Sequence, residues 1–405
     1  MVVNVLSFAA VSSWIFDWSQ SWSSSSSPES FIATGSSANV SESRIGGGNV
    51  TDDIDFQHLN DADKWTYTYD PSRLSLPQEA KDSISNGCAV AIDRDGNIYV
   101  VFSLKNATDT STAQTMARWD ADGQNGKLMG DVQLSVGAPH GLRIELAGNE
   151  SYFYHANTDY MVHKTNLNGE ILWSTNFSQL GWEHHKKMKK YWPVRPTDAV
   201  VYPGTDYLFV ADGYGSSYIH VLNKTTGKYF SGMSFGGYGN ESSPELHFNV
   251  PHGIDVDTHP PKFAVRTADL RLGDDPLLLI SDRNNSRIVW TTFNGSFVGA
   301  LSTNVSAGMQ LPSNAKGDNT TFLVPSWGSL EDLSDGGVAL YYRGDDLKLS
   351  GVVPIAQQIG HLGCLHPHDA QLLRGGNIVV VCYGAPYTNG SVKISYWARK
   401  PLLDE

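Results

Sequence analysis

Cysteine, basic residues and long apolar runs are all scarce in this 405-residue chain. Its three cysteines, Cys88, Cys364 and Cys382, allow one disulfide with one thiol left over, and the sequence does not fix the pairing. There is no Cys-x-x-Cys motif, which argues against a cysteine-based metal or redox function. The net charge of −13 argues against a nucleic-acid partner, whose phosphates require a basic surface. No apolar run approaches the roughly 20 residues that span a bilayer, so we expect no membrane span.

Glycine, proline and aromatic residues are plentiful instead. The chain has 39 Gly, 18 Pro, 18 Tyr and 11 Trp, and only 18% of it is charged. Few segments have the apolar spacing of a helix, whereas short β-branched and aromatic runs occur throughout. This balance favours an all-β architecture.

Asn-x-Ser/Thr sequons, the acceptor pattern for N-linked glycans, recur along the chain. One sequon arises easily by chance, but many sequons in turn-like polar stretches indicate a eukaryotic secretory glycoprotein. The alternative is a surface rich in Ser, Thr and Asn on which only some sites carry glycan. We therefore expect a secreted, extracellular protein. The twelve sequons begin at Asn39, Asn49, Asn106, Asn149, Asn176, Asn223, Asn240, Asn284, Asn294, Asn304, Asn319 and Asn389.

One strand pattern recurs six times from about residue 87 onward. The copies begin at NGCAVAIDRDGNIYVVF (86–102), PHGLRIEL (139–146), PTDAVVYPG (196–204), PHGIDVD (251–257), a degenerate LPSNA (311–315) and PHDAQLLRGGNIVVVCY (367–383). Each copy is a small meander that cannot bury both faces alone, so the copies must pack around an axis. A β-sandwich would not explain a motif at the head of successive units. We predict a six-bladed β-propeller over residues 61–405.

The last copy is one strand short. KWTYTYD (64–70) alternates as a strand should and precedes the first copy. We expect it to supply the missing outer strand and close the ring, which removes open sheet edges.

Three of the copies carry a histidine at the same aligned position: His140, His252 and His368, each after a proline. Their spacings of 112 and 116 residues correspond to two copies each, so they belong to alternate blades. The heads of the innermost strands line the channel of a propeller, and the three imidazoles should therefore converge on its axis. That geometry suits a three-histidine metal site with an open position for water or substrate. The alternative is that each imidazole bonds a backbone group at its strand start.

The motifs VAIDRDGNIYVVF, PHGL, PTDAVV, FVADGYGSSYI, VPHGIDVD, SDRNNSRI and HPHDA, in this order, resemble the catalytic propeller of the peptidyl-α-hydroxyglycine amidating lyases (PAL), relatives of NHL-type propellers. The resemblance covers about residues 86–385. It implies a zinc ion held by three histidines, which match His140, His252 and His368. It also implies cleavage of a peptidyl-α-hydroxyglycine to a peptide amide and glyoxylate.

The same resemblance implies a structural calcium ion and two catalytic residues. The calcium ligands match the main-chain carbonyls of Val90 and Leu142 and the carboxylate of Asp369, and such hard oxygen ligands suit Ca²⁺. Tyr214, in ADGY, matches the residue that would take the substrate hydroxyl proton beside the metal. Arg283, in SDRNNSRI, matches an arginine that would hold the substrate carboxylate through a bidentate pair.

The chain departs from the PAL pattern at two positions. An ungapped count from Val90 places Ser103 where the family has an essential arginine, and Lys105 nearby lacks the forked geometry of a guanidinium. His366 stands where the family has a methionine beside the third histidine. The resemblance therefore implies a retained metal frame with an incomplete catalytic set.

The first 60 residues form a separate, Ser-rich segment, which we expect to be an extended arm. VVNVLSFAAVSSWIF lacks the basic start of a signal peptide, so we interpret it as part of the mature chain. Its apolar strand has no vacant place in the closed ring, so we expect it to be donated to a neighbouring subunit as an added strand. Packing on its own propeller is the alternative. Heterologous contacts of this kind build filaments.

Three functions remain open from the sequence. We expect a PAL-like, zinc- and calcium-binding glycoprotein that self-assembles through its arm as a structural subunit of an extracellular filament or matrix. The alternatives are an active amidating lyase and a secreted binding propeller. Whether the chain is an enzyme depends on what the loss of the arginine at Ser103 costs.

Overall fold

A computed structural model of the chain describes residues 65–104, 115–129, 139–179, 193–230, 232–239, 246–259, 276–303, 366–383 and 393–401, with shorter segments at 311–312, 316–317, 321–327, 337–343, 347–353 and 364. All of these residues belong to one compact unit, Thr51–Glu405. The predicted arm, residues 1–60, lies outside the described residues. No helix in the described part of the chain is long and apolar enough to cross a membrane.

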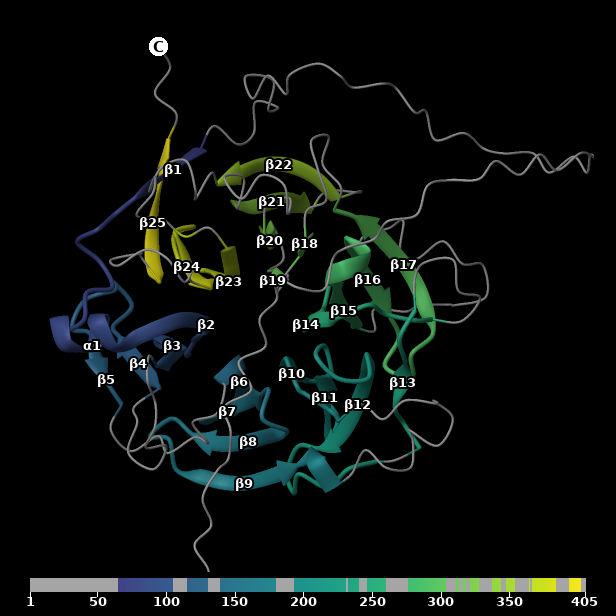
Figure 1. Cartoon of the computed structure of the whole chain (residues 1–405). Coiled ribbons are helices and arrows are strands. Elements are labelled where there is room, and N and C mark those ends of the chain that lie inside the picture. Colours follow the sequence, from purple (N-terminus) through teal and green to yellow (C-terminus); the bar gives the residue numbers. More distant parts are fainter. Residues whose placement is uncertain are drawn as a thin grey trace, which may run out of the picture. The chain divides into compact units, whose positions relative to one another are not determined.

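The described strands form separate small antiparallel sheets, which we number in chain order (Figure 1). Sheet 1 contains β2 (Ile84–Ile92), β3 (Ile98–Leu104), β4 (Met116–Trp119) and β5 (Lys127–Leu128); sheet 2 contains β6 (Pro139–Ala147), β7 (Glu150–Asn157), β8 (Met161–Asn166) and β9 (Ile171–Asn176). Sheet 3 contains β10 (Asp198–Val201), β11 (Tyr207–Ala211), β12 (Tyr218–Asn223) and β13 (Phe235–Gly236); sheet 4 contains β14 (Pro251–Asp257), β15 (Leu277–Asp282), β16 (Arg287–Thr291) and β17 (Phe297–Ser302).

The last two sheets differ in regularity. Sheet 5 contains β18 (Leu311–Pro312), β19 (Lys316–Gly317), β20 (Thr321–Trp327), β21 (Gly337–Arg343) and β22 (Leu347–Val353); sheet 6 contains β23 (His366–Leu372), β24 (Ile378–Tyr383), β25 (Ile394–Pro401) and β1 (Trp65–Tyr69). In sheet 5, the two-residue strands β18 and β19 both pair with β20, and residues 313–315 between them lie outside the described residues. The expected all-β, propeller-like fold is confirmed, but the prediction of six blades is corrected to five regular four-stranded blades. Sheet 5, which contains the degenerate repeat, is described only in part.

The sheets follow one another around a ring, seen face-on in Figure 1. Their inner strands make the neighbour contacts: β2 with β6, β6 with β10, β10 with β14, β20 with β23, and β23 with β2. Sheets 4 and 5 meet through β16 and β18. The only regular helix among the described residues, α1 (Gln78–Ser83), precedes β2, and single 3₁₀ turns follow β9 (Phe177–Gln179) and β15 (Arg283–Asn285).

The hydrophobic core lies between neighbouring sheets. In β24, the four consecutive residues Ile378, Val379, Val380 and Val381 are all fully buried. Val379 and Val381 pack with sheet 1, whereas Ile378 and Val380 pack with sheet 5. Because successive side chains of a strand point to opposite faces, a strand buried on both faces needs a continuous apolar run. This is why β24 is a continuous apolar run, IVVVC, and not a strand in which apolar and polar residues alternate.

The ring closes where the sequence predicts. Strand β1 pairs with β25 in antiparallel register from Trp65 opposite Pro401 to Tyr69 opposite Trp397. The Tyr67 hydroxyl also donates a hydrogen bond to the Gly376 carbonyl at 3.1 Å. The last sheet is therefore completed by a strand from before the first one, and about 330 residues of chain are closed by this one pairing.

The structure decides the cysteine pairing that the sequence leaves open. Cys364 and Cys382 form a disulfide with a Cα–Cα distance of 5.3 Å, which joins the segment before β23 to the end of β24. Cys88 is a free, buried thiol, and burial raises its pKa to about 12. Because the thiolate is the reactive form, Cys88 is inert at neutral pH.

Candidate metal centre

The three predicted histidines occupy the same local structure in their strands. In each inner strand the pairing register shifts at this residue: between Pro139 and Gly141, between Pro251 and Gly253, and between Pro367 and Asp369. A bulge leaves one residue out of the ladder and redirects its side chain. The repeated Pro-His therefore places each imidazole away from the sheet face and toward the ring axis.

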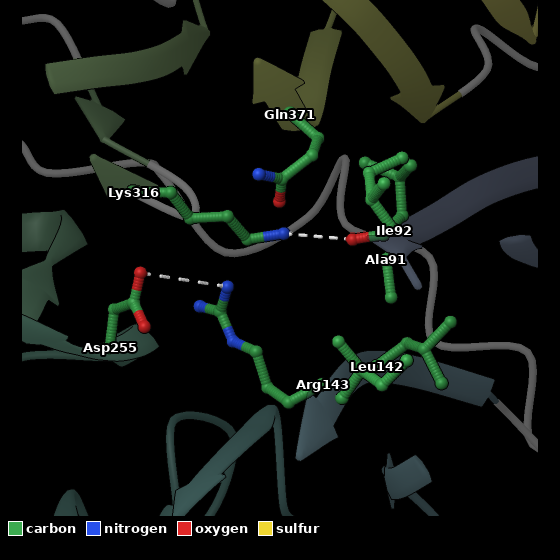
Figure 2. A pocket seen from close by; sticks show the side chains of 9 residues that line it. Ala91, Ile92, Leu142, Arg143, Asp255, Lys316 and Gln371 are labelled. Atoms are coloured by element: carbon green, nitrogen blue, oxygen red, sulfur yellow. Dashed lines mark hydrogen bonds and ion pairs between the residues drawn. The ribbon is translucent and has the colours of Figure 1, made fainter. Parts of the chain in front are cut away.

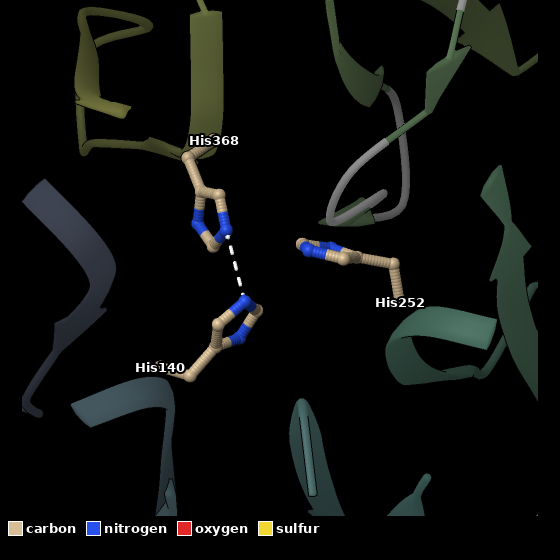
Figure 3. A group of neighbouring side chains, drawn as sticks. All are labelled: His140, His252 and His368. Carbon is tan, nitrogen blue, oxygen red and sulfur yellow. Dashed lines mark hydrogen bonds between the residues drawn. The ribbon is translucent and has the colours of Figure 1, made fainter. Parts of the chain in front are cut away.

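The three imidazoles converge at the centre of the ring (Figure 3). Their ligand atoms all lie within 4.8 Å of one another, and Nε2 of His368 is 3.2 Å from Nε2 of His140. The ring centres of His140, His252 and His368 are separated by 4.6–4.8 Å. All three residues are buried. The geometry brings together side chains from sheets 2, 4 and 6.

Backbone carbonyls of the intervening sheets orient two of these imidazoles. Nδ1 of His140 donates to the Thr197 carbonyl at 2.7 Å, and Nδ1 of His368 donates to the Cys88 carbonyl at 2.5 Å. A carbonyl can only accept, so Nδ1 carries the proton and Nε2 presents a lone pair to the centre. Carbonyl acceptors of this kind orient metal-binding histidines. In sheets 3 and 1, Thr197 and Cys88 occupy the position that the histidines occupy in the other sheets. The imidazoles of His140 and His368 are therefore each oriented by a backbone carbonyl of a neighbouring sheet.

This arrangement fits a metal ion. Nε2 of His140 and Nε2 of His368 face each other as two lone pairs 3.2 Å apart, a contact that a cation between them would relieve. Two donors bound tetrahedrally to zinc at about 2.0–2.1 Å are roughly 3.3 Å apart. Burial, with a further contribution from His368, lowers the pKa of His140 well below its usual range, and burial lowers that of His368 to about 4. Both imidazoles are therefore neutral at neutral pH, which is the ligating form.

Tyr214 lies directly beside the histidines. Its phenol oxygen is 2.9 Å from Nε2 of His252 and 3.2 Å from Nε2 of His140. Asp212 holds the turn that presents it: one carboxylate oxygen accepts from the Arg195 backbone N–H and the other from the backbone and side chain of Ser216. At Gly215, a Cβ atom would collide with the Asp212 carboxylate, so the turn requires glycine there.

Arg283 completes the group. Its Nη1 donates to the Tyr214 oxygen at 3.2 Å, and its guanidinium carbon lies 5.3 Å from the centre of the Tyr214 ring. The residue is buried and begins the 3₁₀ turn after β15, where its backbone N–H donates to the Val250 carbonyl. The structure thus brings Tyr214 into contact with two of the three histidines and Arg283 into contact with Tyr214.

The two departures from the family pattern also lie near the site. Ser103 is half-buried in β3 and pairs with Asn86, two residues before Cys88. His366 begins β23, two residues before His368. Tyr383, which the sequence analysis did not single out, has its ring centre 6.1 Å from that of His368. Its aromatic character at the end of β24 is the one signal that points to it.

The predicted calcium ligands come together, but around a lysine. Nζ of Lys316 donates to the Val90 carbonyl at 3.0 Å and to Oδ2 of Asp369 at 2.6 Å. Leu142 lines the same pocket of about 200 Å3 as Lys316 and Val90 (Figure 2). Two of the three predicted calcium oxygens are thus already bound to a buried ammonium group, and the residues present do not fit a calcium ion at this position.

Five predicted glycosylation sites fall within the described residues. Asn149, Asn176, Asn284 and Asn294 are exposed. Asn223 is half-buried, and its side-chain oxygen accepts hydrogen bonds from Thr225 and Thr226 in the turn after β12. Four of the five are therefore accessible to a glycan. The other seven lie outside the described residues: Asn39, Asn49, Asn106, Asn240, Asn304, Asn319 and Asn389.

Comparisons with known proteins add little beyond these observations. The sequence matches no protein-family profile, and no curated protein is significantly similar to it. A solved structure of a protein of unknown function from Bacteroides caccae is 12% identical, with a TM-score of 0.45 over 68% of this chain and 83% of that one. A second, from Bacteroides thetaiotaomicron, is 11% identical, with a TM-score of 0.46 over 78% and 70%. Similarity this low carries no argument about function.

Proposed function

We propose that this chain is a secreted, N-glycosylated β-propeller, and that zinc bound by His140, His252 and His368 stabilises it as a structural subunit of an extracellular assembly. The observation that carries the proposal is the convergence of three buried imidazoles from three different sheets. A zinc ion there would link sheets 2, 4 and 6 across the axis. Metal binding to the folded ring alone adds its binding free energy to the stability of the ring.

Two observations support an extracellular location. The Cys364–Cys382 disulfide is of a kind that persists in oxidising compartments. Four sequons are exposed on the described surface. Assembly through residues 1–60 rests on the sequence: an apolar, strand-like sequence precedes a ring in which β1 already fills the outer strand position of sheet 6.

Metal content and stability test the zinc site. Purified protein should contain about one zinc ion per chain, and chelation should lower its melting temperature. His252→Asn should remove the ion and abolish the effect of chelation, because one of three ligands is lost. The exposed His259→Asn is the matched control and should retain zinc. A protein that contains no zinc and melts at the same temperature with and without added zinc would contradict the proposal.

Two truncations test the arm. Removal of residues 1–30 should leave a folded propeller that no longer assembles, as measured by light scattering and electron microscopy. Removal of residues 1–70 also deletes β1, leaves β25 as an open edge, and should lower the melting temperature as well. If full-length protein and the shorter truncation are both monomers of equal stability, the arm does not mediate assembly.

The second candidate function is an amidating lyase, and the contact between Tyr214 and Arg283 favours it. Bound zinc would supply a Lewis acid beside the substrate hydroxyl. In its deprotonated form, Tyr214 would accept the substrate hydroxyl proton at its phenol oxygen, and Arg283 would hold that oxygen and an anionic substrate group together. The Ser103 hydroxyl cannot make the bidentate hydrogen bond of an arginine guanidinium, which is why we rank the structural role first.

A further inference from the structure

Lys316 occupies a junction of three sheets. It comes from the two-residue strand β19 of sheet 5, and its side chain is 5% exposed. Its ammonium group contacts the Asp369 carboxylate of sheet 6 and the Val90 carbonyl of sheet 1. The same carboxylate oxygen accepts a hydrogen bond from the Val90 backbone N–H at 2.9 Å. A carboxylate, a backbone strand and a cation thus meet at the centre of the ring.

The same arrangement occurs a second time across the ring, around Asp198. Arg143 of sheet 2 donates from Nη2 to Oδ2 of Asp198 in sheet 3 at 2.6 Å and to the Ile254 carbonyl of sheet 4 at 2.8 Å. The Asp198 oxygen also accepts from the Ile254 backbone N–H at 3.1 Å. Figure 2 shows Arg143 and Lys316 extending into the same pocket from opposite sides.

The two arrangements are equivalent by sequence position. Asp198 and Asp369 occupy the third residue of PTDA and PHDA, and Ile254 and Val90 both lie two residues after the bulge position of their strands. In each case a cation from one sheet binds the aspartate of the next sheet and the carbonyl of the sheet after that. Arg143 belongs to the regular strand β6. The contacts of Lys316 repeat those of Arg143, so they follow from the sequence repeat of the ring.

We propose that Lys316 permanently fills the cation position at Asp369, so that this propeller holds sheets 5, 6 and 1 together without calcium. A tethered ammonium group satisfies the same carboxylate and carbonyl that a calcium ion would need. Asp255, 4.0 Å from Arg143, is the third carboxylate of this layer. Arg143 and Lys316 neutralise two of the three carboxylates Asp198, Asp255 and Asp369, and a divalent ion would have to displace the lysine.

None of the three histidines lines the pocket around Lys316, so zinc content and Ca²⁺ binding are measured as separate quantities. Protein is stripped of metal, reloaded with one equivalent of zinc, and titrated with Ca²⁺ by calorimetry and thermal unfolding. The wild-type protein should bind no Ca²⁺ at millimolar concentrations. Its melting temperature should be the same with and without added Ca²⁺. Lys316→Met should melt at least about 5 °C lower, because it leaves a buried carboxylate without its cation. Lys316→Arg, which retains the charge, is the matched control and should melt near the wild-type temperature.

Lys316→Ala also opens space at the site. We expect Ca²⁺ to bind this variant and to restore part of its lost melting temperature, with no such recovery in Lys316→Met, whose side chain fills the position. The inference is overturned if wild-type protein binds one Ca²⁺ with a rise in melting temperature, or if Lys316→Met melts at the wild-type temperature. Neither result affects the zinc content at the histidines, which is measured in the same samples.

Discussion

The guanidinium of Arg283 and the phenol of Tyr214 are joined by a hydrogen bond of 3.2 Å, and the same phenol oxygen contacts two of the three histidines. Tyr214 therefore belongs to the candidate metal centre by contact, whether or not it takes part in a reaction. Two roles of Tyr214 can therefore be measured separately: orienting the histidines and acting on a substrate.

Tyr214→Phe should retain zinc with an affinity lowered about 10-fold, because it removes a supporting contact and no histidine ligand. Competition with a chromophoric chelator measures this affinity. His252→Asn should lose more affinity than Tyr214→Phe. Equal losses in the two variants would mean that Tyr214 is itself a ligand as necessary as a histidine.

Wild-type protein should release little or no glyoxylate from an α-hydroxyglycine peptide, because Ser103 cannot make the contact of an arginine. Loss of one transition-state contact commonly costs about 10²–10³ in rate. Ser103→Arg should raise the rate, and Ser103→Lys, which lacks the fork, should raise it less. Robust glyoxylate release by the unmodified protein would place the lyase function ahead of the structural one.

The disulfide should contribute to stability through the 18-residue separation of its cysteines. Closing a loop of this size stabilises by about 3 kcal/mol in the chain-entropy description. The double variant Cys364→Ser, Cys382→Ser should lose about that much in urea unfolding, and added reductant should destabilise the wild type but not the double variant. Cys88→Ser is the control that keeps the disulfide, so it should still respond to reductant.

A pair of buried histidines in sheet 2 predicts acid sensitivity. His155 and His163 lie opposite each other in β7 and β8, and burial lowers their pKa values to about 3 and about 4. Below pH 6.5 the unfolded chain takes up these protons before the folded protein does, so stability is present above pH 6.5 and falls as the pH drops toward 4. The slope is about 1.4 kcal/mol per pH unit for each histidine.

Replacing both histidines with glutamine should reduce this pH dependence by roughly two protons, measured as the free energy of unfolding between pH 6.5 and 4.5 with zinc saturating. The exposed His259→Gln should leave the slope unchanged. An unchanged slope in the double variant would show that these two imidazoles are not held neutral.

The sequence by itself determined the features that repeat. Pro139-His140, Pro251-His252 and Pro367-His368 recur two copies apart, and identical local chemistry folds into the same bulge on each strand. The closing strand could also be predicted from the sequence, since residues 65–69 have the alternating pattern of a strand and the last repeat is one strand short. The exposed position of Asn149 and Asn294 follows from their turn-forming neighbours.

Only the tertiary structure decided what depends on contacts between distant segments. Cys382 had two possible partners, and the close approach of Cys364 selected one. Lys316 follows the degenerate repeat at 311–315, and its role became visible once Val90 and Asp369, separated by 279 residues, met at its ammonium group. A buried charge is tolerated only beside its partners, and a linear pattern does not contain those distances.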